Sequence, residues 1–516
     1  MGLDYRKGTM TDLLLLRDGD DVAVATRDLA AGEEVVLPGR GATVVGEVPR
    51  GHKVAVRGVA AGAPVHKYGQ VIGVATAAIE PGAHVHTHNL GFEEGEREHE
   101  LATVRTELPV PGGPRPTFRG YPRANGKVGT RNYVVILTSV NCSASTAKMI
   151  ADQFRGFAMD AYDDVDGVVA LTHQSGCGLV PTSEGAQVLL RTLRGYAQHP
   201  NVAGILVLGL GCEMIAVDTI LAGAAVSPDT LVRTLTIQDA GGVRATVRAG
   251  SAAVKEMLDE LDGRWQRTEC DVADLVLGLN CGGSDGYSGI TANPALGWAS
   301  DRLVAYGGTS VLAETPEVFG AEHLLTRRAV SPEVGQRLIE RIEWWKQYAA
   351  AGGGSLDNNP SPGNKAGGLT TILEKSLGAV AKGGQADLAA VHEYAEPLDT
   401  RGFVFMDTPG YDPVSVTGIV AGGANVVCFT TGRGSVFGCK PAPSIKLGTN
   451  SELYARMGDD IDIDCGRIVT GEATLEQVGQ EIFDRILAVA SGELTASEDL
   501  DIGGEEFVPW QLGTVT

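Results

Sequence analysis

The chain contains 516 residues, of which 43% are hydrophobic, so it is long enough for several domains and apolar enough to give each of them a core. Its 42 lysines and arginines against 64 acidic residues give a formal net charge of −22, which argues against nucleic acid or an anionic membrane as a partner. The sequence shows no signal-peptide pattern and no apolar run of membrane-spanning length, so we expect a cytoplasmic protein.

Residues 1–105 are predicted to be all-β. Short valine-rich runs are separated by a recurring turn, which reads DLAAGEEV at 28–35, GVAAGAPV at 58–65 and AIEPGAHV at 78–85. Glycine occupies the same place in each copy, where it supplies the backbone freedom that a tight turn needs. The N-terminal region is therefore expected to be a small, hairpin-rich domain.

Histidines gather within this region. His84, His86 and His88 lie at every second position, so in an extended segment their imidazoles share one face, a spacing that suits a metal or an anionic substrate. His52 lies elsewhere in the same region. Histidines at the surface end of a strand are the plainer explanation. We expect one or two of these side chains to reach a neighbouring active site rather than all three to hold a metal.

Residues 106–119 are rich in proline and glycine and are predicted to be a linker. The basic segment that follows contains Arg131, which either faces a carboxylate substrate or belongs to a solvated connector. The next domain, an α/β domain, is expected to span residues 120–268.

Four apolar runs, at 133–138, 167–171, 202–208 and 273–279, are predicted to be strands. Each is followed by a polar segment that carries a thiol, and these thiols, spaced 35, 35 and 69 residues apart, are Cys142, Cys177, Cys212 and Cys281. This spacing is typical of a strand, a crossover helix and two loops, with the helices at about 143–154, 182–193 and 214–224. Because the carboxyl ends of parallel strands meet at one edge of a sheet, we expect the four thiols to converge.

Thiolates and imidazole suit iron or zinc better than magnesium. The four strand-end cysteines and Glu213 are therefore candidate metal ligands, and His173 is the candidate base or an additional ligand. A mononuclear Fe(II) site with an open coordination position and an iron–sulfur cluster are both compatible with these residues, whose spacing matches no ferredoxin run. Ordinary buried core cysteines are the alternative.

Residues 269–516 are predicted to form a third, α/β region. Apolar runs at 404–406 and 426–429 again end in glycines and hydroxyls, and amphipathic helices are predicted at 336–348 and 474–490. The region is therefore expected to contain a second set of strand-end loops.

Cations are scattered through this third region. Arg433 lies between two glycines, which leave its guanidinium open to a carboxylate, and Lys446 follows closely. Lys365 ends the loop NPSPGNK at 359–365, where it is either catalytic, anion-binding or part of an ordinary surface loop. These groups favour an anionic, carboxylate-bearing substrate.

Soft ligands beside cations suit the removal of water from a hydroxy acid, because the proton α to the carboxylate must leave, the enediolate needs a cation, and the departing hydroxide needs a Lewis acid. Asp285 is a further candidate base. A lyase that ejects sulfite uses the same proton abstraction and is the nearer alternative. A nucleotide- or phosphate-binding regulatory protein is an alternative of another class, although no GxxxxGK[ST] motif and no GxGxxG after a strand is present.

Eight motifs spread over nearly the whole chain carry a family resemblance. They are GHKVA at 51–55, HVHTHN at 84–89, VGTRN at 128–132, GLGCE at 209–213, CGGSD at 281–285, TANP at 291–294, NPSPGNK at 359–365 and TGRG at 431–434. With them the sequence resembles the altronate and galactarate dehydratases, bacterial hexonate and hexarate hydro-lyases. The resemblance implies a multidomain α/β protein with an N-terminal SAF-like β domain, a Rossmann-like middle domain and a large C-terminal α/β domain.

The resemblance also implies dehydration of a sugar acid such as D-altronate to a 2-keto-3-deoxy sugar acid, with a divalent metal, iron, as the cofactor. The HVHTHN segment favours altronate over galactarate, and the fusion of all parts in one chain favours a dehydratase over a sulfolactate-cleaving lyase, whose parts are separate chains. A homo-oligomer, a dimer, is expected. The residues assigned to substrate binding are His52, His86, His88, Arg131, Ser284, Asn293, Arg433 and Lys446, and those assigned to catalysis are His173, Lys365 and Asp285.

Overall fold

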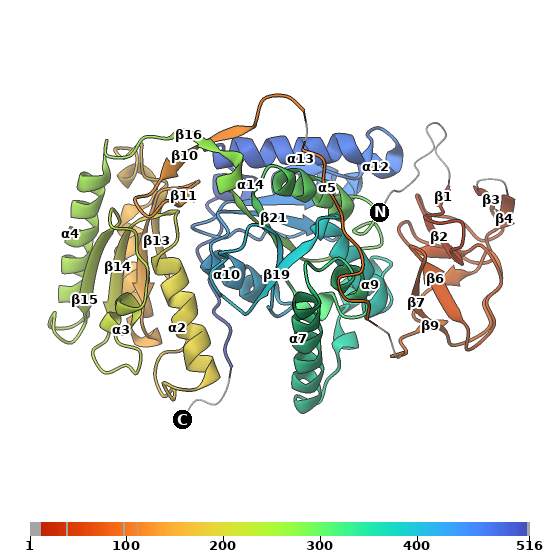
Figure 1. The fold of residues 1–516 in the computed structure, drawn as a ribbon, viewed down its shortest axis with the longest axis horizontal. Coiled ribbons are helices and arrows are strands. Elements are labelled where there is room, and N and C mark those ends of the chain that lie inside the picture. Colours follow the sequence, from red (N-terminus) through yellow and green to blue (C-terminus); the bar gives the residue numbers. More distant parts are fainter. Residues whose placement is uncertain (1–11, 38–39, 96–98, 111, 513–516) are drawn as a thin grey trace.

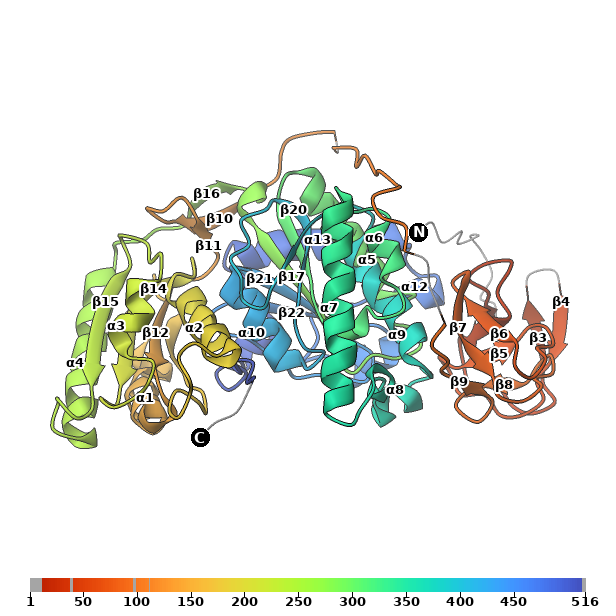
Figure 2. The same ribbon diagram turned by 60° about the horizontal axis from the view of Figure 1, so that its bottom comes forward.

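The computed structural model describes residues 12–37, 40–95, 99–110 and 112–512. They form three parts in a row, with the N-terminal β domain at one end, the middle part at the other, and the C-terminal part between them (Figure 1, Figure 2). Among the helices of these described residues, none combines the length and the apolar composition needed to cross a membrane.

The N-terminal domain is built from short antiparallel strands. One sheet has the order β1 (Leu13–Leu14), β2 (Val22–Ala25), β5 (Lys53–Ala55) and β8 (His84–Val85), and a second has the order β6 (Pro64–Lys67), β7 (Gln70–Ala75) and β9 (Leu90–Gly91). β3 (Glu34–Leu37) pairs with β4 (Arg40–Thr43). Gly32, Gly62 and Gly82 have φ of 78°, 80° and 83°, which confirms the three predicted turns.

The middle part contains a parallel sheet in the order β13 (Gly167–Leu171), β12 (Tyr133–Thr138), β14 (Val202–Gly209) and β15 (Leu231–Thr236). α1 (Ala144–Ala151) and α4 (Val243–Leu261) pack on one face of this sheet, and α2 (Glu184–Ala197) and α3 (Val217–Ala222) pack on the other. The three predicted strands and three predicted helices of this region are therefore present, with each helix starting one to three residues later than expected. The Rossmann-like label stays a prediction.

The C-terminal part is organised around a seven-stranded parallel sheet. Its order is β19 (Leu388–His392), β20 (Gly402–Met406), β18 (Thr309–Leu312), β17 (Val276–Cys281), β21 (Val426–Thr431), β22 (Ser444–Gly448) and β23 (Ile463–Asp464). The helices α5 (Ala292–Ala305), α7 (Pro332–Ala351), α10 (Asp412–Gly422) and α13 (Leu475–Ala490) surround it (Figure 1). Because β17 belongs to this sheet and not to the middle sheet, the expectation that all four strand-end thiols converge is wrong.

A small sheet joins the middle and C-terminal parts. It pairs β10 (Thr117–Pro122) with β11 (Val128–Gly129) on one side and with β16 (Thr268–Asp271) on the other. The last residues of the predicted linker therefore lie in β10, and the predicted boundary after residue 268 falls inside β16. The chain thus enters the middle part through β10 and leaves it through β16, and these two strands pair with each other rather than being free connectors.

The N-terminal domain docks on α8 (Pro362–Ala366) and α9 (Ile372–Ala379), which lie on the side of the C-terminal part that faces it (Figure 2). Lys53 Nζ and Lys67 Nζ each donate to one carboxylate oxygen of Glu374 at 2.9 Å, and all three side chains are 0% exposed. Lys53 also donates to the Gly368 carbonyl oxygen at 2.6 Å. This docking triad, Lys53, Lys67 and Glu374, places two charges from the N-terminal domain on one carboxylate of the C-terminal part.

We predict that Glu374→Gln loosens this junction, because it leaves two buried ammonium groups without a counter-charge. Breaking a buried ion pair costs about 3–5 kcal/mol. Hydrogen–deuterium exchange should therefore quicken in β5 and α9, and the free energy of opening the junction should fall by about that amount. The exposed pair Lys255–Asp259 supplies the control, since Asp259→Asn should leave exchange at the junction unchanged. Unaltered protection of β5 in Glu374→Gln would contradict the role of the docking triad.

Candidate active site

The carboxyl edge of the seven-stranded sheet gathers most of the reactive groups of the C-terminal part. β17 ends at Cys281 and leads into the CGGSD loop, β18 leads to Glu314, and β21 leads to the loop that carries Arg433. In open parallel sheets ligands bind at this edge, because the loops that follow the strands there take no part in the hydrogen bonding of the sheet. The candidate site is therefore built on these loops.

A buried charge cluster lies at the centre of the edge and comprises Cys281, Glu314, Glu317, Lys375 and Lys382. Lys382 Nζ lies 2.8 Å from Cys281 Sγ and 2.6 Å from Glu314 Oε2, and Lys375 Nζ lies 2.6 Å from Glu317 Oε1. Cys281 Sγ is 3.5 Å from an oxygen of each glutamate. The two lysines therefore compensate the two carboxylates around the thiol.

Asp412 adds a third carboxylate to this neighbourhood. A Cβ atom on Gly282 would collide with its Oδ2, so Gly282 is the residue that lets Asp412 approach the CGGSD loop. Burial raises the pKa of Asp412 to about 8, and Glu314 and Glu317 add to the rise. Burial also raises the pKa of the Cys281 thiol far above its ordinary range. The edge thus carries more acidic groups than the two lysines neutralise.

The charge cluster contains a donor set that fits a divalent metal. One ligand atom from each of Cys281, Glu314 and Glu317 lies within 4.8 Å of the others, and this is the sole such group that the described residues form. Glu314 Oε1 is buried and has no hydrogen-bond partner among the described residues, so one carboxylate oxygen is available. A thiol beside carboxylates suits a borderline metal such as Fe(II) or Zn(II) better than Mg(II).

A histidine cluster, His52, His84, His86 and His88, faces the same edge from the N-terminal domain. Neighbouring ring centroids in it are 4.9 to 5.5 Å apart. His52 Nε2 lies 3.2 Å from the Ala366 carbonyl oxygen, and His86 Nε2 lies 2.8 Å from the Lys365 carbonyl oxygen. His52 and His86 therefore bind carbonyl oxygens at the end of α8, and Lys365, predicted to end a loop, lies in this short helix.

These contacts fix the position of the ring protons. Because a carbonyl oxygen only accepts, His52 Nε2 carries a proton and His52 Nδ1 accepts from His84 Nε2, 3.0 Å away. His84 Nδ1 is then left with its lone pair. Burial lowers the pKa of His52 to about 4 and that of His84 to about 3, so both rings are neutral at pH 7.

The exposed side of the site is formed by Arg433, Lys365 and the CGGSD loop. A Cβ atom on Gly367 would lie 3.1 Å from Arg433 Cδ, and the Ser284 carbonyl oxygen accepts from Asn364 Nδ2 at 2.8 Å. Arg433 is exposed and Lys365 is half-buried. The residues from sequence analysis that lie together here are His52, His86, His88, Ser284, Asp285, Lys365 and Arg433.

Asp285 is the centre of this loop rather than an available base. Its carboxylate accepts from Thr449 Oγ1 at 2.9 Å, from Ser288 Oγ at 3.0 Å and from Asn450 Nδ2 at 3.1 Å. Burial raises the pKa of Asp285 and these hydrogen bonds oppose the rise. A Cβ atom on Gly432 would collide with the same carboxylate, so Asp285 links the CGGSD loop to the TGRG loop.

Three residues assigned to substrate binding are used elsewhere in the fold, which corrects those assignments. Arg131 donates to both carboxylate oxygens of Glu498, at 2.7 and 2.8 Å, and to backbone carbonyls. Asn293 bonds to the Gly378 carbonyl oxygen and the Thr430 hydroxyl. Lys446 is buried in β22 and donates to the Phe437 carbonyl oxygen. Their donors are therefore occupied away from solvent.

His173 is also corrected, because it is a buried structural histidine of the middle part. Its Nε2 donates to the Thr138 carbonyl oxygen at 3.0 Å and its Nδ1 accepts from the Ser175 N–H at 3.2 Å. Burial lowers its pKa to about 4. With both nitrogens engaged, His173 joins the ends of β12 and β13 and has no lone pair for a substrate proton.

Sequence reasoning missed most of the charge cluster. The signal for Glu314 and Glu317 was present, since ETPE at 314–317 follows a short apolar run, the same strand-end rule that identified Cys281. Lys375 and Lys382 lie in α9 and a 3-10 helix at Val380–Gly383, where lysine is ordinarily a solvated residue. No local pattern distinguishes them.

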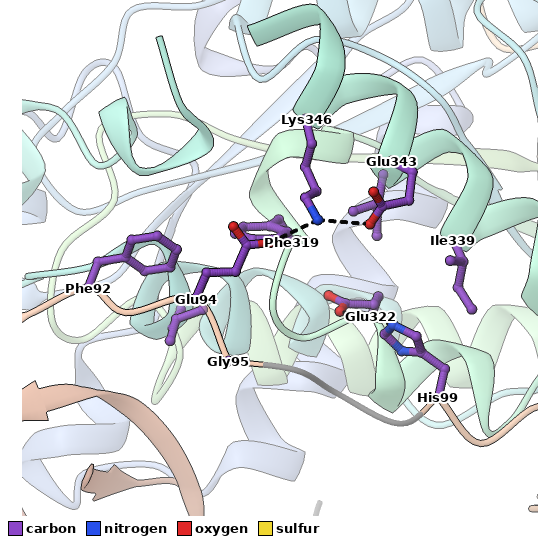
Figure 3. Close-up of a pocket in the computed structure, with 11 residues that line it drawn as sticks. Phe92, Glu94, Gly95, His99, Phe319, Glu322, Ile339, Glu343 and Lys346 are labelled. Atoms are coloured by element: carbon purple, nitrogen blue, oxygen red, sulfur yellow. Dashed lines mark hydrogen bonds and ion pairs between the residues drawn. The ribbon is translucent and has the colours of Figure 1, made fainter. Parts of the chain in front are cut away.

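A separate pocket of about 320 Å³ lies between α7 and the residues Phe92, Glu94, Gly95 and His99 (Figure 3). Its lining includes Glu94, Glu322 and Glu343, and Lys346 binds Glu94 at 2.8 Å and Glu343 at 3.0 Å. None of its described lining residues belongs to the loops that follow β17 or β21. Its carboxylates do not suit an anionic substrate.

Comparison with known proteins adds family models that match three stretches of the chain. The altronate/galactarate dehydratase SAF domain matches residues 11–93, the second domain of D-galactarate dehydratase/altronate hydrolase matches residues 120–262, and the C-terminal domain of D-galactarate/altronate dehydratase matches residues 272–515.

Curated relatives are similar over almost their whole length. Galactarate dehydratase (L-threo-forming) of Escherichia coli is 38% identical over 506 residues, which cover 96% of each chain. Altronate dehydratase of Bacillus subtilis is 35% identical over 95% of this chain and 97% of the relative, and altronate dehydratase of Escherichia coli is 37% identical over 93% and 96%.

We predict that His173→Gln weakens the pH dependence of stability at acid pH. The folded pKa of His173, about 4, is below the ordinary histidine value, so the unfolded chain binds the proton first and His173 removes stability as the pH falls from about 6.5 to 4. Glutamine keeps a donor for Thr138 and does not titrate. Thermal unfolding at pH 4 to 7 should show a smaller loss than in the wild type, whereas Gln153→Ala, at an exposed position of the same part whose side chain does not titrate, should keep the pH dependence of the wild type. Identical pH profiles for His173→Gln and the wild type would contradict the prediction.

Proposed function

The chain belongs to the altronate/galactarate dehydratase family, and from that premise we propose that it is a metal-dependent hydro-lyase that removes water from a sugar acid, with D-altronate as the first candidate and galactarate as the alternative. The observation that carries the proposal is the meeting of the histidine cluster, Arg433 and the charge cluster at one sheet edge. The identities to galactarate and altronate dehydratases differ too little to choose between the two substrates.

The exposed cations supply the binding of the substrate carboxylate. Arg433 extends from a Gly-Arg-Gly turn, where its planar guanidinium can form two parallel hydrogen bonds to a carboxylate. Lys365 lies in the last turn of the neighbouring helix α8 and adds a second positive charge. A carboxylate bound there would lie with its α carbon towards the CGGSD loop and the imidazoles of the N-terminal domain.

The histidine cluster supplies the acceptor for the α proton. The hydrogen-bond chain from the Ala366 carbonyl oxygen through His52 to His84 leaves the lone pair on His84 Nδ1, so that atom accepts the proton without a change of tautomer. A bound carboxylate raises the proton affinity of this imidazole above its value in the free enzyme. Lys365 is the second candidate for the same step.

Cys281, Glu314 and Glu317 would hold the divalent metal, which we propose to be Fe(II). When bound, that metal supplies the Lewis acid that stabilises the enediolate charge and the departing hydroxide. Asp412, whose raised pKa keeps a proton near neutral pH, is suited to protonate the leaving hydroxyl. Lys375 and Lys382 keep the donor set neutral enough to remain buried.

The alternative within the same chemistry is elimination of sulfite, because the chain also resembles a (2R)-sulfolactate sulfo-lyase beta subunit, 32% identical over 77% of this chain, and, over 47 residues, an alpha subunit from another organism. Those parts are separate subunits, whereas here they are fused, which favours the dehydratase. Family membership gives no support to the nucleotide-binding regulatory alternative. The homo-oligomer and the cytoplasmic location stay predictions.

An assay of substrates tests the proposal directly. We expect protein purified without oxygen and supplied with Fe(II) to form a 2-keto-3-deoxy acid from altronate or galactarate, with little turnover after removal of iron by a chelator. Both sugar acids and sulfolactate should be compared in the same preparation. Release of sulfite from sulfolactate, with no keto acid from any aldonate or aldarate, would assign the chain to the sulfo-lyase alternative.

We predict that Arg433→Ala lowers kcat/KM about 10- to 100-fold, because a hydrogen bond to a charged group contributes about 1.5–3 kcal/mol. Arg433→Lys should recover part of the loss, since it restores the charge without the planar fork. Arg155→Ala, which removes an exposed arginine of the middle part, should leave kcat/KM unchanged. Full activity of Arg433→Ala would place the substrate carboxylate elsewhere.

A further inference from the structure

We propose that Cys142, Cys177 and Cys212 hold an iron–sulfur cluster of the [4Fe–4S] type at the carboxyl edge of the middle sheet. This site is separate from the charge cluster and does not depend on the proposed dehydratase function. Each thiol releases its proton when it binds iron, and the fourth iron keeps an open position for water or another oxygen ligand.

The topology brings these three thiols to one place. Cys142 lies in the 3-10 turn Asn141–Ser143 after β12, Cys177 lies in the loop after β13, and Cys212 lies in the loop after β14. β13, β12 and β14 are adjacent and parallel, so their carboxyl ends point in the same direction at one edge of the sheet. The thiols therefore come from three neighbouring loops.

Backbone hydrogen bonds tie the three loops together beside the thiols. The Asn141 N–H donates to the Ser175 carbonyl oxygen at 2.9 Å, and the Met214 N–H donates to the Gly176 carbonyl oxygen at 3.2 Å. These bonds lie one or two residues from the cysteines. The three-thiol edge is thus a single connected surface rather than three independent loops.

Exposure separates these cysteines from the rest. Cys142, Cys177 and Cys212 are exposed and reduced, whereas the other five cysteines, Cys270, Cys281, Cys428, Cys439 and Cys465, are buried. Cysteine is one of the most frequently buried residues, because a thiol packs as a small apolar group. Three exposed thiols on adjacent strand ends are therefore available as ligands.

Glycines shape the backbone beside two of the three thiols. Gly176 and Gly178, on either side of Cys177, have φ of 100° and 69°, and Gly211 before Cys212 has φ of 121°. Positive φ at these glycines lets the chain turn sharply beside Cys177 and Cys212. Cys142 lies two residues before α1 begins.

Glu213 belongs to the frame of this edge rather than to its ligands, which corrects its assignment as a metal ligand. Its carboxylate accepts from Ser139 Oγ at 2.8 Å and from the N–H groups of Gly211 and Cys212 at 2.6 and 2.9 Å. These donors occupy both oxygens. Together with the hydrogen bonds of His173, they fix the loops that carry the three exposed thiols.

The spacing of the thiols favours a cluster over one metal ion. Within the described residues, the three cysteines do not form a group whose ligand atoms all lie within 4.8 Å. Ligands of a single tetrahedral ion must be closer than that, whereas the thiolates of a [4Fe–4S] cluster bind different irons and stand further apart. By the same measure of ligand-atom distances, the charge cluster is the site that suits a single ion.

The test measures metal and sulfide in the full chain, without substrate. After reconstitution with iron and inorganic sulfide in the absence of oxygen, we expect about four irons and four acid-labile sulfides per chain, with visible sulfide-to-iron absorption and, after reduction, an electron paramagnetic resonance signal. The variant Cys142→Ser/Cys177→Ser/Cys212→Ser should lose the sulfide and the signal but keep its fold by circular dichroism. Cys270→Ala, which removes a buried thiol, should retain both.

Three results would overturn the proposal: iron without sulfide in the wild type, zinc as the only bound metal, or unchanged sulfide in the triple variant. If the triple variant proves unstable, the single variant Cys177→Ser, at an exposed position, must still lose the cluster signal. Because no readout requires turnover, failure of the dehydratase assay leaves this test valid. Conversely, loss of the cluster with turnover retained would leave the proposed function intact.

Discussion

The contact between Glu374 and the two lysines of the N-terminal domain is the interaction on which the candidate site depends. Lys53 is the first residue of β5, and His52 directly precedes it. The ion pair that anchors Lys53 therefore also sets the distance between His52 and the Ala366 carbonyl oxygen. Because both ammonium groups are paired with one carboxylate and shielded from solvent, a small displacement of the N-terminal domain would break these hydrogen bonds. The small β domain is therefore part of the site and not an appendage.

The charge cluster shows how the central sheet keeps ionised groups in its interior. Glu314 adopts φ of 68°, a left-handed conformation that is costly for a residue with a Cβ atom, and its N–H donates to Thr408 Oγ1 at 2.8 Å. The conformation turns its carboxylate back over the end of β17, where Lys382 meets it. A strained backbone and a buried charge at the same residue are typical of functional positions, where contacts with surrounding residues stabilise an otherwise unfavourable conformation.

The four strand-end cysteines, which the sequence predicted to form one site, lie at the edges of two different sheets. The middle sheet presents three exposed thiols, which are soft ligands, and the C-terminal sheet presents one buried thiol among carboxylates and lysines. The first edge suits a thiolate-bound cluster and the second suits a single divalent ion. A chain of this design therefore has room for two kinds of metal chemistry, and Arg433 and Lys365, the cations proposed to bind the substrate, lie beside only the second edge.

The sequence by itself determined the strands of the middle part, the turns at Gly32, Gly62 and Gly82, and the rule that reactive residues follow strands, because these depend on local patterns of apolar residues and glycine. The prediction that Arg433 is open to a carboxylate has the same local basis, the two glycines that flank it. Only the tertiary structure decided which sheet each strand joins, and so separated Cys281 from the other thiols. Lys382, Lys375, Arg131 and His173 show why: whether a charged or titratable side chain is an open ligand, a buried counter-ion or a loop clamp depends on partners hundreds of residues away, and no local pattern records them.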